Sequence, residues 1–492
     1  MAGVRSGRTV QGTERSKTDV VVVGSGAGGA AAAYELASAG LEVLVLEAGP
    51  QVRPEEFTQR EMDTVKRLYV DLGAQGPADG SIRILQGRMV GGSTVINAEA
   101  CFRIPDFILE AWATDHGVRG LSPADMRDAF ESVERMIHAT PNEGRSLGAG
   151  KRFAAGLTSL GITAKPLVRG VKDCHQCCYC MFGCAYGCKQ STDRSYLPAA
   201  MERGAVVVSE ARVEKLVLQG GRAAGVVART AEGALEVSAR AVVLACGAIE
   251  TPLMLVDHGL GGPAIGRHLA LHPVVSVLGW YDDEQAEYRS AMLSQFSDDF
   301  LRDGFVIELF GLSPAFSGPQ VPGFGADHKR GARDLARTSA AAAVVRDDGA
   351  LGRVRRNRRG EKVIEYALDA QGRARVRRAL KTLAEIALAS GAHKVTLSPL
   401  TRPTEVASAA DLRKLDDVPL GPADVAFVSY HPQGTARLGV VTDLDGAVRG
   451  ARDLYVMDAS LFPGPVGVNT QVPVMGVATV LARRLGERLK RA

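Results

Sequence analysis

The chain has 492 residues, which is too long for one hydrophobic core, so two or three packed units are expected. Its composition is that of an ordinary soluble enzyme, and its formal net charge of +4 is too small to indicate nucleic-acid binding. No stretch approaches the roughly 20 apolar residues of a membrane span. We expect residues 1–17 to be a disordered polar tail rather than a signal peptide, and the protein to be cytoplasmic, without a transmembrane segment.

A pattern typical of dinucleotide binding follows this tail. "DVVVVG" predicts a buried strand, "SGAGGAAAAYELASAG" a helix, and "EVLVLEAG" a second strand. Gly24, Gly26 and Gly29 form G-x-G-x-x-G, in which they permit the tight turn, the approach of a pyrophosphate and close helix packing, respectively. Glu47 has the spacing of an acid that binds ribose hydroxyls. This acid argues against NADP and leaves NAD and FAD open.

The next motif, "QGRMVGGSTVINAEACFR", begins at Gln86. Its glycines and small hydroxyls would let backbone amides close around a flat ring or a phosphate. It matches G-R-x-x-G-G-S-[ST]-x-x-N, and the chain therefore resembles the glucose–methanol–choline (GMC) family of FAD-dependent alcohol oxidoreductases. The matching residues are Gly87, Arg88, Gly91, Gly92, Ser93, Thr94 and Asn97.

Two further segments extend the resemblance. "VVLACGAIETPLML" is similar to a second family signature, and predicts a strand, a turn at Gly247 and a helix that begins at Thr251-Pro252. "IGRHLALHP" is similar to the family's G-x-N-L-x-x-H, with His268 where Asn is usual.

The C-terminal segments "HPQGTARLG" and "LYVMDASLFP", followed by an Asn-Thr pair, resemble the family's last signature. By that resemblance His431 is the catalytic base and Asn469 the second catalytic residue. The chemistry suits such a pair, because a neutral imidazole can take the hydroxyl proton while an amide holds the oxygen and FAD accepts the hydride.

The resemblance also assigns cofactor contacts outside the glycine-rich segments. It implies that Asp458 and Ala459 lie near the ribityl–pyrophosphate of the flavin and that the backbone of Val213 meets the adenine. A helix that begins near Thr470 would point its positive N-terminus at the flavin ring.

Six of the eight cysteines lie in "DCHQCCYCMFGCAYGC". Clustered thiols in a reducing compartment indicate metal ligands, and the segment resembles that of long-chain alcohol oxidases and, more loosely, an iron–sulfur segment of FAD-dependent sugar dehydrogenases. A [3Fe–4S] or [4Fe–4S] cluster, a zinc site and a metal-free thiol loop remain alternatives. The predicted ligands are Cys174 or Cys177, together with Cys178, Cys184 and Cys188.

The expected fold class is α/β, with a Rossmann-like FAD-binding domain of the GMC type and a discontinuous α+β substrate domain. The predicted divisions are 18–110, 190–270 and 426–492 for the FAD-binding domain, 111–172 for a helical extension, 173–190 for a Cys-rich hinge and 271–425 for the substrate domain.

The expected function is FAD-dependent oxidation of a small-molecule alcohol, apolar rather than a sugar. With a cluster, electrons would pass singly to an acceptor protein; without one, O₂ would accept them. The alternatives are an O₂-using long-chain alcohol oxidase, a ketone- or steroid-desaturating flavoenzyme, and a flavin-binding scaffold without activity.

Overall fold

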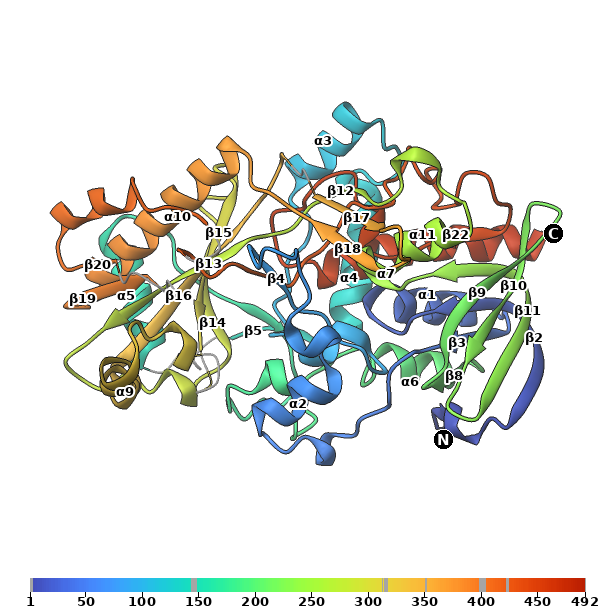
Figure 1. Ribbon diagram of the computed structural model, residues 1–492, viewed down its shortest axis with the longest axis horizontal. Coiled ribbons are helices and arrows are strands. Elements are labelled where there is room, and N and C mark those ends of the chain that lie inside the picture. Colours follow the sequence, from blue (N-terminus) through green and yellow to red (C-terminus); the bar gives the residue numbers. More distant parts are fainter. Residues whose placement is uncertain are drawn as a thin grey trace.

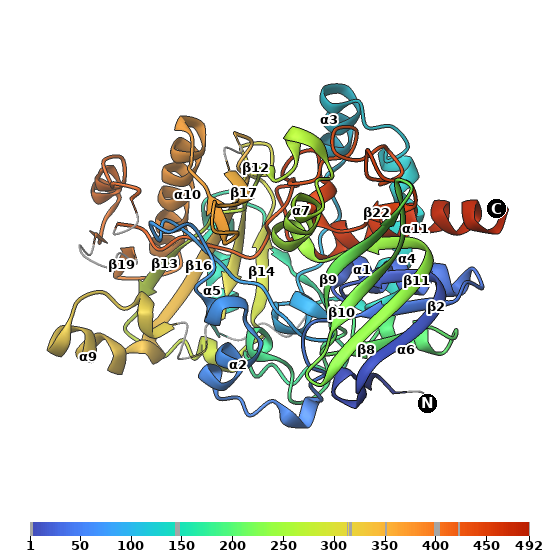
Figure 2. The ribbon, with the colours of Figure 1, turned by 45° about the vertical axis from the view of Figure 1, so that its right-hand side comes forward.

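The computed structural model describes residues 3–142, 148–311, 313, 317–349, 352–397, 404–421 and 424–491. These residues form two units that lie side by side, each built around its own large β-sheet (Figures 1 and 2). The Rossmann-like fold expected from the sequence is present in the first unit.

The centre of the first sheet is a set of buried parallel strands. In β2 (Gly12–Val23) the residues Val20 to Val22 are fully buried, as expected for a strand that is covered on both faces. The strand order is β1-β8-β3-β2-β11-β10-β9, with β22 beside β11. The other bounds are β1 Arg5–Ser6, β3 Val43–Leu46, β8 Val206–Ser209, β9 Arg212–Gln219, β10 Arg222–Arg229, β11 Gly233–Leu244 and β22 Leu454–Val456.

Helices α1 and α11 pack against each other beside this sheet, and α11 also packs on α4. Close packing of α1 depends on its glycines: a Cβ at Gly28 would lie 1.9 Å from the carbonyl oxygen of Met457. The helices of this half are α1 Ala27–Ser38, α2 Glu61–Leu68, α3 Asp106–His116, α4 Pro123–Met136, α6 Tyr196–Met201, α7 Gly247–Asp257 and α11 Gln471–Arg491.

The second sheet has the order β20-β19-β13-β16-β15-β14-β6, and β21 pairs with both β13 and β4. Helix α10 packs on β13 and β16 and buries an apolar face that includes Leu380 and Leu383. The bounds are β4 Arg83–Ile84, β6 Lys165–Pro166, β13 Val274–Trp280, β14 Leu293–Ser297, β15 Phe305–Phe310, β16 Thr338–Val345, β19 Lys394–Leu397, β20 Glu405–Val406, β21 Val428–Ser429, α5 Gly148–Ser159, α9 Gly325–Arg333 and α10 Ala370–Ala389.

Two smaller sheets complete the strands. One has the order β12-β17-β18, and β17 carries Arg353, Arg355 and Arg356; the other sheet pairs β5 with β7. Their bounds are β12 Arg267–Leu269, β17 Gly352–Arg356, β18 Lys362–Glu365, β5 Ala139–Pro141 and β7 Val168–Gly170. The segment predicted as a helical extension, 111–172, contains α4 and α5 but ends in the strands β6 and β7.

The prediction of a disordered tail over residues 1–17 is wrong for the part that the structure describes. Arg5 pairs in parallel with Val208, and β2 already begins at Gly12, where it pairs with Gly233. Residues 12–17 are mostly exposed, so this half of β2 lacks the apolar pattern by which a strand is recognised.

Helix α7 begins at Gly247, four residues earlier than predicted. Pro252 therefore lies inside the helix, where it cannot donate to the carbonyl oxygen of Ala248. Thr435 Oγ1 donates to that oxygen instead, at 2.7 Å. A side chain distant in sequence thus replaces the missing hydrogen bond, which local sequence could not indicate.

None of the helices in the described ranges combines the length and the apolar character that crossing a membrane requires. The cytoplasmic location stays a prediction.

Candidate active site

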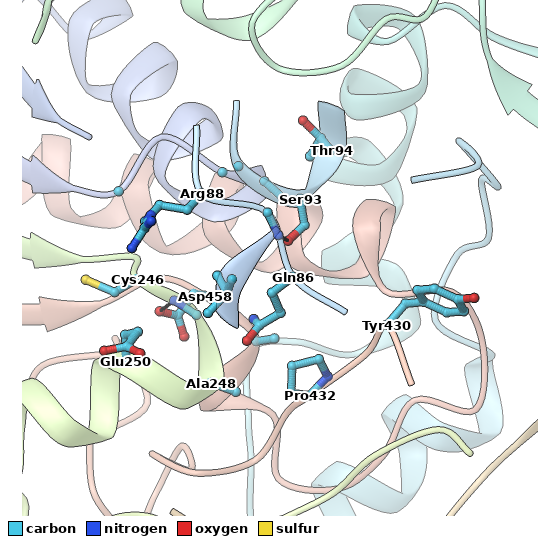
Figure 3. A pocket seen from close by; sticks show the side chains of 18 of the residues that line it. Gln86, Arg88, Ser93, Thr94, Cys246, Ala248, Glu250, Tyr430, Pro432 and Asp458 are labelled. Atoms are coloured by element: carbon cyan, nitrogen blue, oxygen red, sulfur yellow. Dashed lines mark hydrogen bonds between the residues drawn. The ribbon is translucent and has the colours of Figure 1, made fainter. Parts of the chain in front are cut away.

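A cavity of about 610 Å³ is lined by residues of both units. Figure 3 shows Arg88, Cys246 and Glu250 at one end of the group of lining side chains and Tyr430 at the other, with Gln86 and Pro432 between them. Of the predicted cofactor and catalytic residues, Gly29 and Gly91 do not line this cavity. The others do: Gly24, Gly26, Glu47, Arg88, Gly92, Ser93, Asn97, Val213, His431, Asp458, Ala459, Asn469 and Thr470.

The turn between β2 and α1 has the conformation that a dinucleotide turn requires. Gly24 has φ +100, which favours glycine, and a Cβ at Gly29 would lie 2.0 Å from the carbonyl oxygen of Gly24. At the N-cap of α1, Gly26 supplies no side chain to the first amides of the helix. The amides of Ala27 and Gly28 border the cavity and have no backbone partner among the described residues, so they could hold a phosphate.

Ser25, which the sequence analysis did not select, ties this turn to its neighbours. Its hydroxyl donates to Glu47 Oε2 at 2.7 Å and accepts from the Gly91 amide at 3.0 Å. The second oxygen of Glu47 accepts from the Gly49 amide at 2.9 Å. Burial raises the pKa of Glu47, and these hydrogen bonds oppose the rise. The acid is therefore held rigidly at the end of β3, next to the glycine turn.

Asp458 fixes the cavity wall next to the start of α1, where a Cβ at Gly28 would lie 3.2 Å from its Cα. Its carboxylate accepts from the Gly247 amide, from Thr251 Oγ1 and from the amide and hydroxyl of Ser460. It thereby joins the start of α7 to the turn after β22. Together with the uncapped helix and the paired glycines, this arrangement fits FAD, whose pyrophosphate the first amides of α1 would hold.

His431 lies in the cavity wall, and its Nδ1 is 3.2 Å from Nδ1 of His272. Burial alone lowers the pKa of His431 to about 3, so the ring is neutral at neutral pH. His272 is completely buried, and burial followed by the nearby His431 also lowers its pKa. His272 is the second-last residue of the motif "IGRHLALHP", but it was not among the predicted catalytic residues.

Asn469 lies just before α11 and contacts Glu308 on β15. The Glu308 carboxyl group is 2% exposed and lines the same cavity as Asn469. Burial raises the pKa of Glu308 to about 8, and the Asn469 contact opposes the rise. Sequence reasoning missed Glu308, although a lone acid in the apolar strand "FVIELF" was a usable signal.

The cysteine-rich segment surrounds a second, much smaller cavity of about 10 Å³. The space is about that of one water-sized probe, too small for the metal and sulfide atoms of a cluster. In the described part of the chain, no three His, Cys, Asp or Glu side chains are placed to hold a metal ion. The cysteines around this cavity are Cys174, Cys177, Cys178, Cys180, Cys184 and Cys188.

The thiols are instead held by local contacts. Cys188 Sγ donates to the carbonyl oxygen of Asp173 at 3.1 Å, and Cys174 Sγ accepts from the amide of Gln176 at 3.4 Å. The residues as placed do not fit the predicted iron–sulfur cluster, and the structure gives no support to the metal ligands chosen from the sequence. We derive no step through a metal.

Comparisons with known proteins agree with this geometry. Sequence models described as GMC oxidoreductase match residues 65–274 and 347–478, and one for an NAD(P)-binding Rossmann-like domain matches residues 22–81. The chain is 34% identical to an uncharacterized GMC-type oxidoreductase of Mycobacterium tuberculosis, over 95% of this chain and 75% of that protein. It is 29% identical to a long-chain-alcohol oxidase of Arabidopsis thaliana, over 96% of this chain and 68% of that protein.

Among solved structures, pyridoxine 4-oxidase from Mesorbium loti superposes with a TM-score of 0.74 at 19% identity, over 95% of this chain and 98% of that one. Formate oxidase superposes with a TM-score of 0.70 at 15% identity, over 98% of this chain and 100% of that one. At these identities the likeness concerns the fold. With the family matches and the relative of 34% identity, the conclusion is that the chain belongs to the GMC family of FAD-dependent oxidoreductases.

Proposed function

We propose that this protein oxidises the CH–OH group of an apolar alcohol to a carbonyl group, with FAD as the hydride acceptor. The observation that carries the proposal is the single cavity that joins the dinucleotide turn at Gly24 to the polar pair His431 and Asn469. FAD, when bound there, supplies the two-electron acceptor. The chain supplies the groups that hold the alcohol oxygen and take its proton.

The walls of the cavity near His431 favour an apolar substrate. Val274, Leu293, Phe310 and Val344 line it from four strands of the second sheet. Such a surface binds an alkyl chain by removing it from water, whereas a sugar needs more hydrogen-bonding partners. The long-chain-alcohol oxidases among the relatives support the same class.

Two roles were expected for His431 and Asn469, with the histidine as base and the amide as its partner. Both side chains lie in the cavity, and the low pKa of His431 keeps its ring uncharged. The long helix α11 begins two residues after Asn469, so its N-terminus supports negative charge at this end of the cavity.

For the electron acceptor we propose O₂ rather than a relay through the cysteines, because the small cysteine-lined cavity does not fit a cluster. Iron and labile-sulfide analysis of anaerobically purified protein tests this choice. Flavin with less than one iron per chain, and hydrogen peroxide formed in step with the carbonyl product, are expected. Several irons per flavin, with turnover only in the presence of an acceptor protein, would favour the relay.

The proposed reaction is tested by mixing the FAD-loaded protein with primary aliphatic alcohols of increasing length in the absence of O₂. The visible flavin band should disappear, faster with longer chains, and the aldehyde should form in equal amount. If the flavin stays oxidised with every alcohol, the protein would instead be the flavin-binding scaffold without activity. Flavin reduction only by a ketone or ketosteroid that has no hydroxyl group would favour the desaturating alternative.

A further inference from the structure

The cysteine-rich segment contributes to an apolar cluster that lies behind one end of the large cavity. The buried members of this cluster are Cys178, Cys180, Met181 and Met292. Among the described residues, the partly buried hydrophobic side chains that pack on the cluster all line the large cavity as well: Leu85, Ala98, Phe310 and Tyr430. The apolar surface at this end of the cavity therefore rests on the cysteine-rich segment.

This apolar end of the cavity begins beside His431. The ring centroids of Tyr430 and His431 are 6.2 Å apart. Figure 3 shows Tyr430 at the opposite end of the group of lining side chains from Arg88 and Glu250. An alcohol whose hydroxyl group lies at His431 can therefore extend its alkyl part over Tyr430 and the side chains that pack with it.

Met181 is the member of the cluster that itself lines the large cavity. It is 2% exposed, and Met292 is buried to a similar extent at 1% exposed. Met292, however, lines the small cysteine-lined cavity and not the large one. A methionine side chain is unbranched and fills irregular apolar space, so the side chain of Met181 limits the room at this end of the large cavity.

The backbone around Met181 is held in place by three side chains from other parts of the protein. The carbonyl oxygen of Met181 accepts from Tyr69 Oη at 2.7 Å. The carbonyl oxygens of the residues just before and just after it accept from Lys189 Nζ at 2.9 Å and from Thr64 Oγ1 at 3.0 Å. All three donors are buried, so these hydrogen bonds fix the position of Met181 in the wall.

We propose that the apolar end of the cavity, lined by Leu85, Phe310 and Tyr430, holds the alkyl group of the alcohol, and that Met181 limits the length of the alkyl group that fits. The inference rests on the proposed alcohol oxidation and names the feature of the substrate that is recognised. The cysteine-rich segment thus contributes to substrate selection by packing, without a metal and without carrying electrons.

Met181→Ala and Met181→Phe test the limit from both sides, with a series of primary alcohols from butanol to hexadecanol. In the wild type, each methylene group that enters the apolar end should raise the second-order rate constant of anaerobic flavin reduction about fourfold, until the alkyl group meets Met181. The alanine variant loses three side-chain atoms, so its best alcohol should be about three carbon atoms longer. The phenylalanine variant should prefer a shorter alcohol than the wild type.

Met292→Ala is the matched control. It makes the same truncation in the same apolar cluster, but at a side chain that does not line the large cavity. It should therefore keep the preference of the wild type for alcohol length. FAD content and melting temperature establish that the variants are folded.

Tyr69→Phe tests whether the position of Met181 matters as well as its size. The substitution removes the hydroxyl group that donates to the carbonyl oxygen of Met181. We expect the rate constant to depend less steeply on alcohol length while butanol reacts as in the wild type. A mere loss of stability would not change the length dependence alone.

A further measurement needs neither a variant nor turnover. A primary alcohol of the preferred length that carries a photoreactive diazirine at its far end is illuminated with the FAD-loaded wild-type protein, and the labelled residues are identified by mass spectrometry. The label is expected on Met181 or on the side chains beside it, Leu85, Phe310 and Tyr430.

The proposal is overturned if the folded Met181 variants keep the wild-type preference, or if Met292→Ala shifts the preference as far as Met181→Ala does. It also falls if the diazirine labels none of the four expected residues. Failure of the proposed function looks different, because the wild-type flavin would then stay oxidised with every alcohol of the series, whichever residues are labelled.

Discussion

The large cavity and the small cysteine-lined cavity both gather buried polar groups, but they differ in whether those groups are satisfied. In the large cavity Glu308 Oε1 and Asn469 Oδ1 lack partners in the described residues, next to about 610 Å³ of space. Around the small cavity Arg169 and Lys189 are buried too, yet both donate to protein atoms. Unsatisfied polar groups beside open space, rather than a concentration of reactive residues, identify the place where chemistry is expected.

The hydrogen-bonded residues around the small cysteine-lined cavity have a structural role. Arg169 donates to Cys180 Sγ at 3.1 Å and to the carbonyl oxygen of Ala98 at 3.3 Å, while Lys189 Nζ donates to the carbonyl oxygens of Asn97 and Cys180. The cysteine-rich segment thereby supports the wall of the flavin cavity from behind.

The largest expected effect is that of Gly29→Val, in the turn between β2 and α1 that borders the large cavity. The new Cβ would lie 2.0 Å from the carbonyl oxygen of Gly24, so α1 could not pack on β2. We expect little soluble protein and no bound flavin. Gly148→Ala is the matched control, because a Cβ at Gly148 meets no atom within 4 Å. Equal flavin content in the two variants would contradict the role of the turn.

Arg169→Met should come next. It leaves the carbonyl of Ala98 and the thiol of Cys180 without their buried donor, and we expect a loss of about 1–3 kcal/mol in the free energy of unfolding together with weaker FAD binding. Chemical unfolding and flavin titration measure the two effects. A variant with unchanged FAD affinity would show that the cysteine-rich segment does not support the cavity.

Glu308→Gln should change the pH dependence of stability. The pKa of Glu308 is raised to about 8 in the folded protein, above its value of roughly 4.3 in the unfolded chain, so its stabilising contribution is complete below about pH 4 and is lost as pH rises through 8. The variant lacks this loss. Its advantage in the free energy of unfolding over the wild type should grow by up to a few kcal/mol between pH 5 and pH 9. A constant difference would mean that Glu308 titrates normally.

The smallest effect is expected from Cys188→Ser, at about 1 kcal/mol of stability or less, with flavin reduction within about twofold of the wild type. The thiol donates to the carbonyl oxygens of Asp173 and Tyr186, and a hydroxyl can donate to the same atoms. If electron transfer to the acceptor is much slower in this variant, the hypothesis of an electron relay through the cysteines would be favoured again.

Sequence reasoning succeeded where short-range patterns carry the information. The buried apolar runs and the glycines predicted a turn at Gly24, a helix after it and a strand before Glu47, and all three are present. It failed at β1 and the start of β2, whose pairing with Val208 and Gly233 depends on distant strands rather than on their own pattern.

The candidate site shows the same division. The motifs selected His431 and Asn469, and both line one cavity. The contacts that determine their protonation and hydrogen bonding come from elsewhere in the chain. His272 is 159 residues from His431 in sequence, and Glu308 lies on a strand of the other unit. Local sequence contained signals for both residues, but the protonation of a buried group depends on such long-range contacts and could not be predicted from those signals.

The most direct test of the account is the rate of anaerobic flavin reduction by a long-chain primary alcohol and by the same alcohol deuterated at the carbinol carbon. If the cavity places that carbon against FAD with His431 and Asn469 at the oxygen, the flavin is reduced and deuterium slows the step several-fold. Absence of reduction, or reduction at the same rate with both alcohols when binding is saturated, would contradict the account.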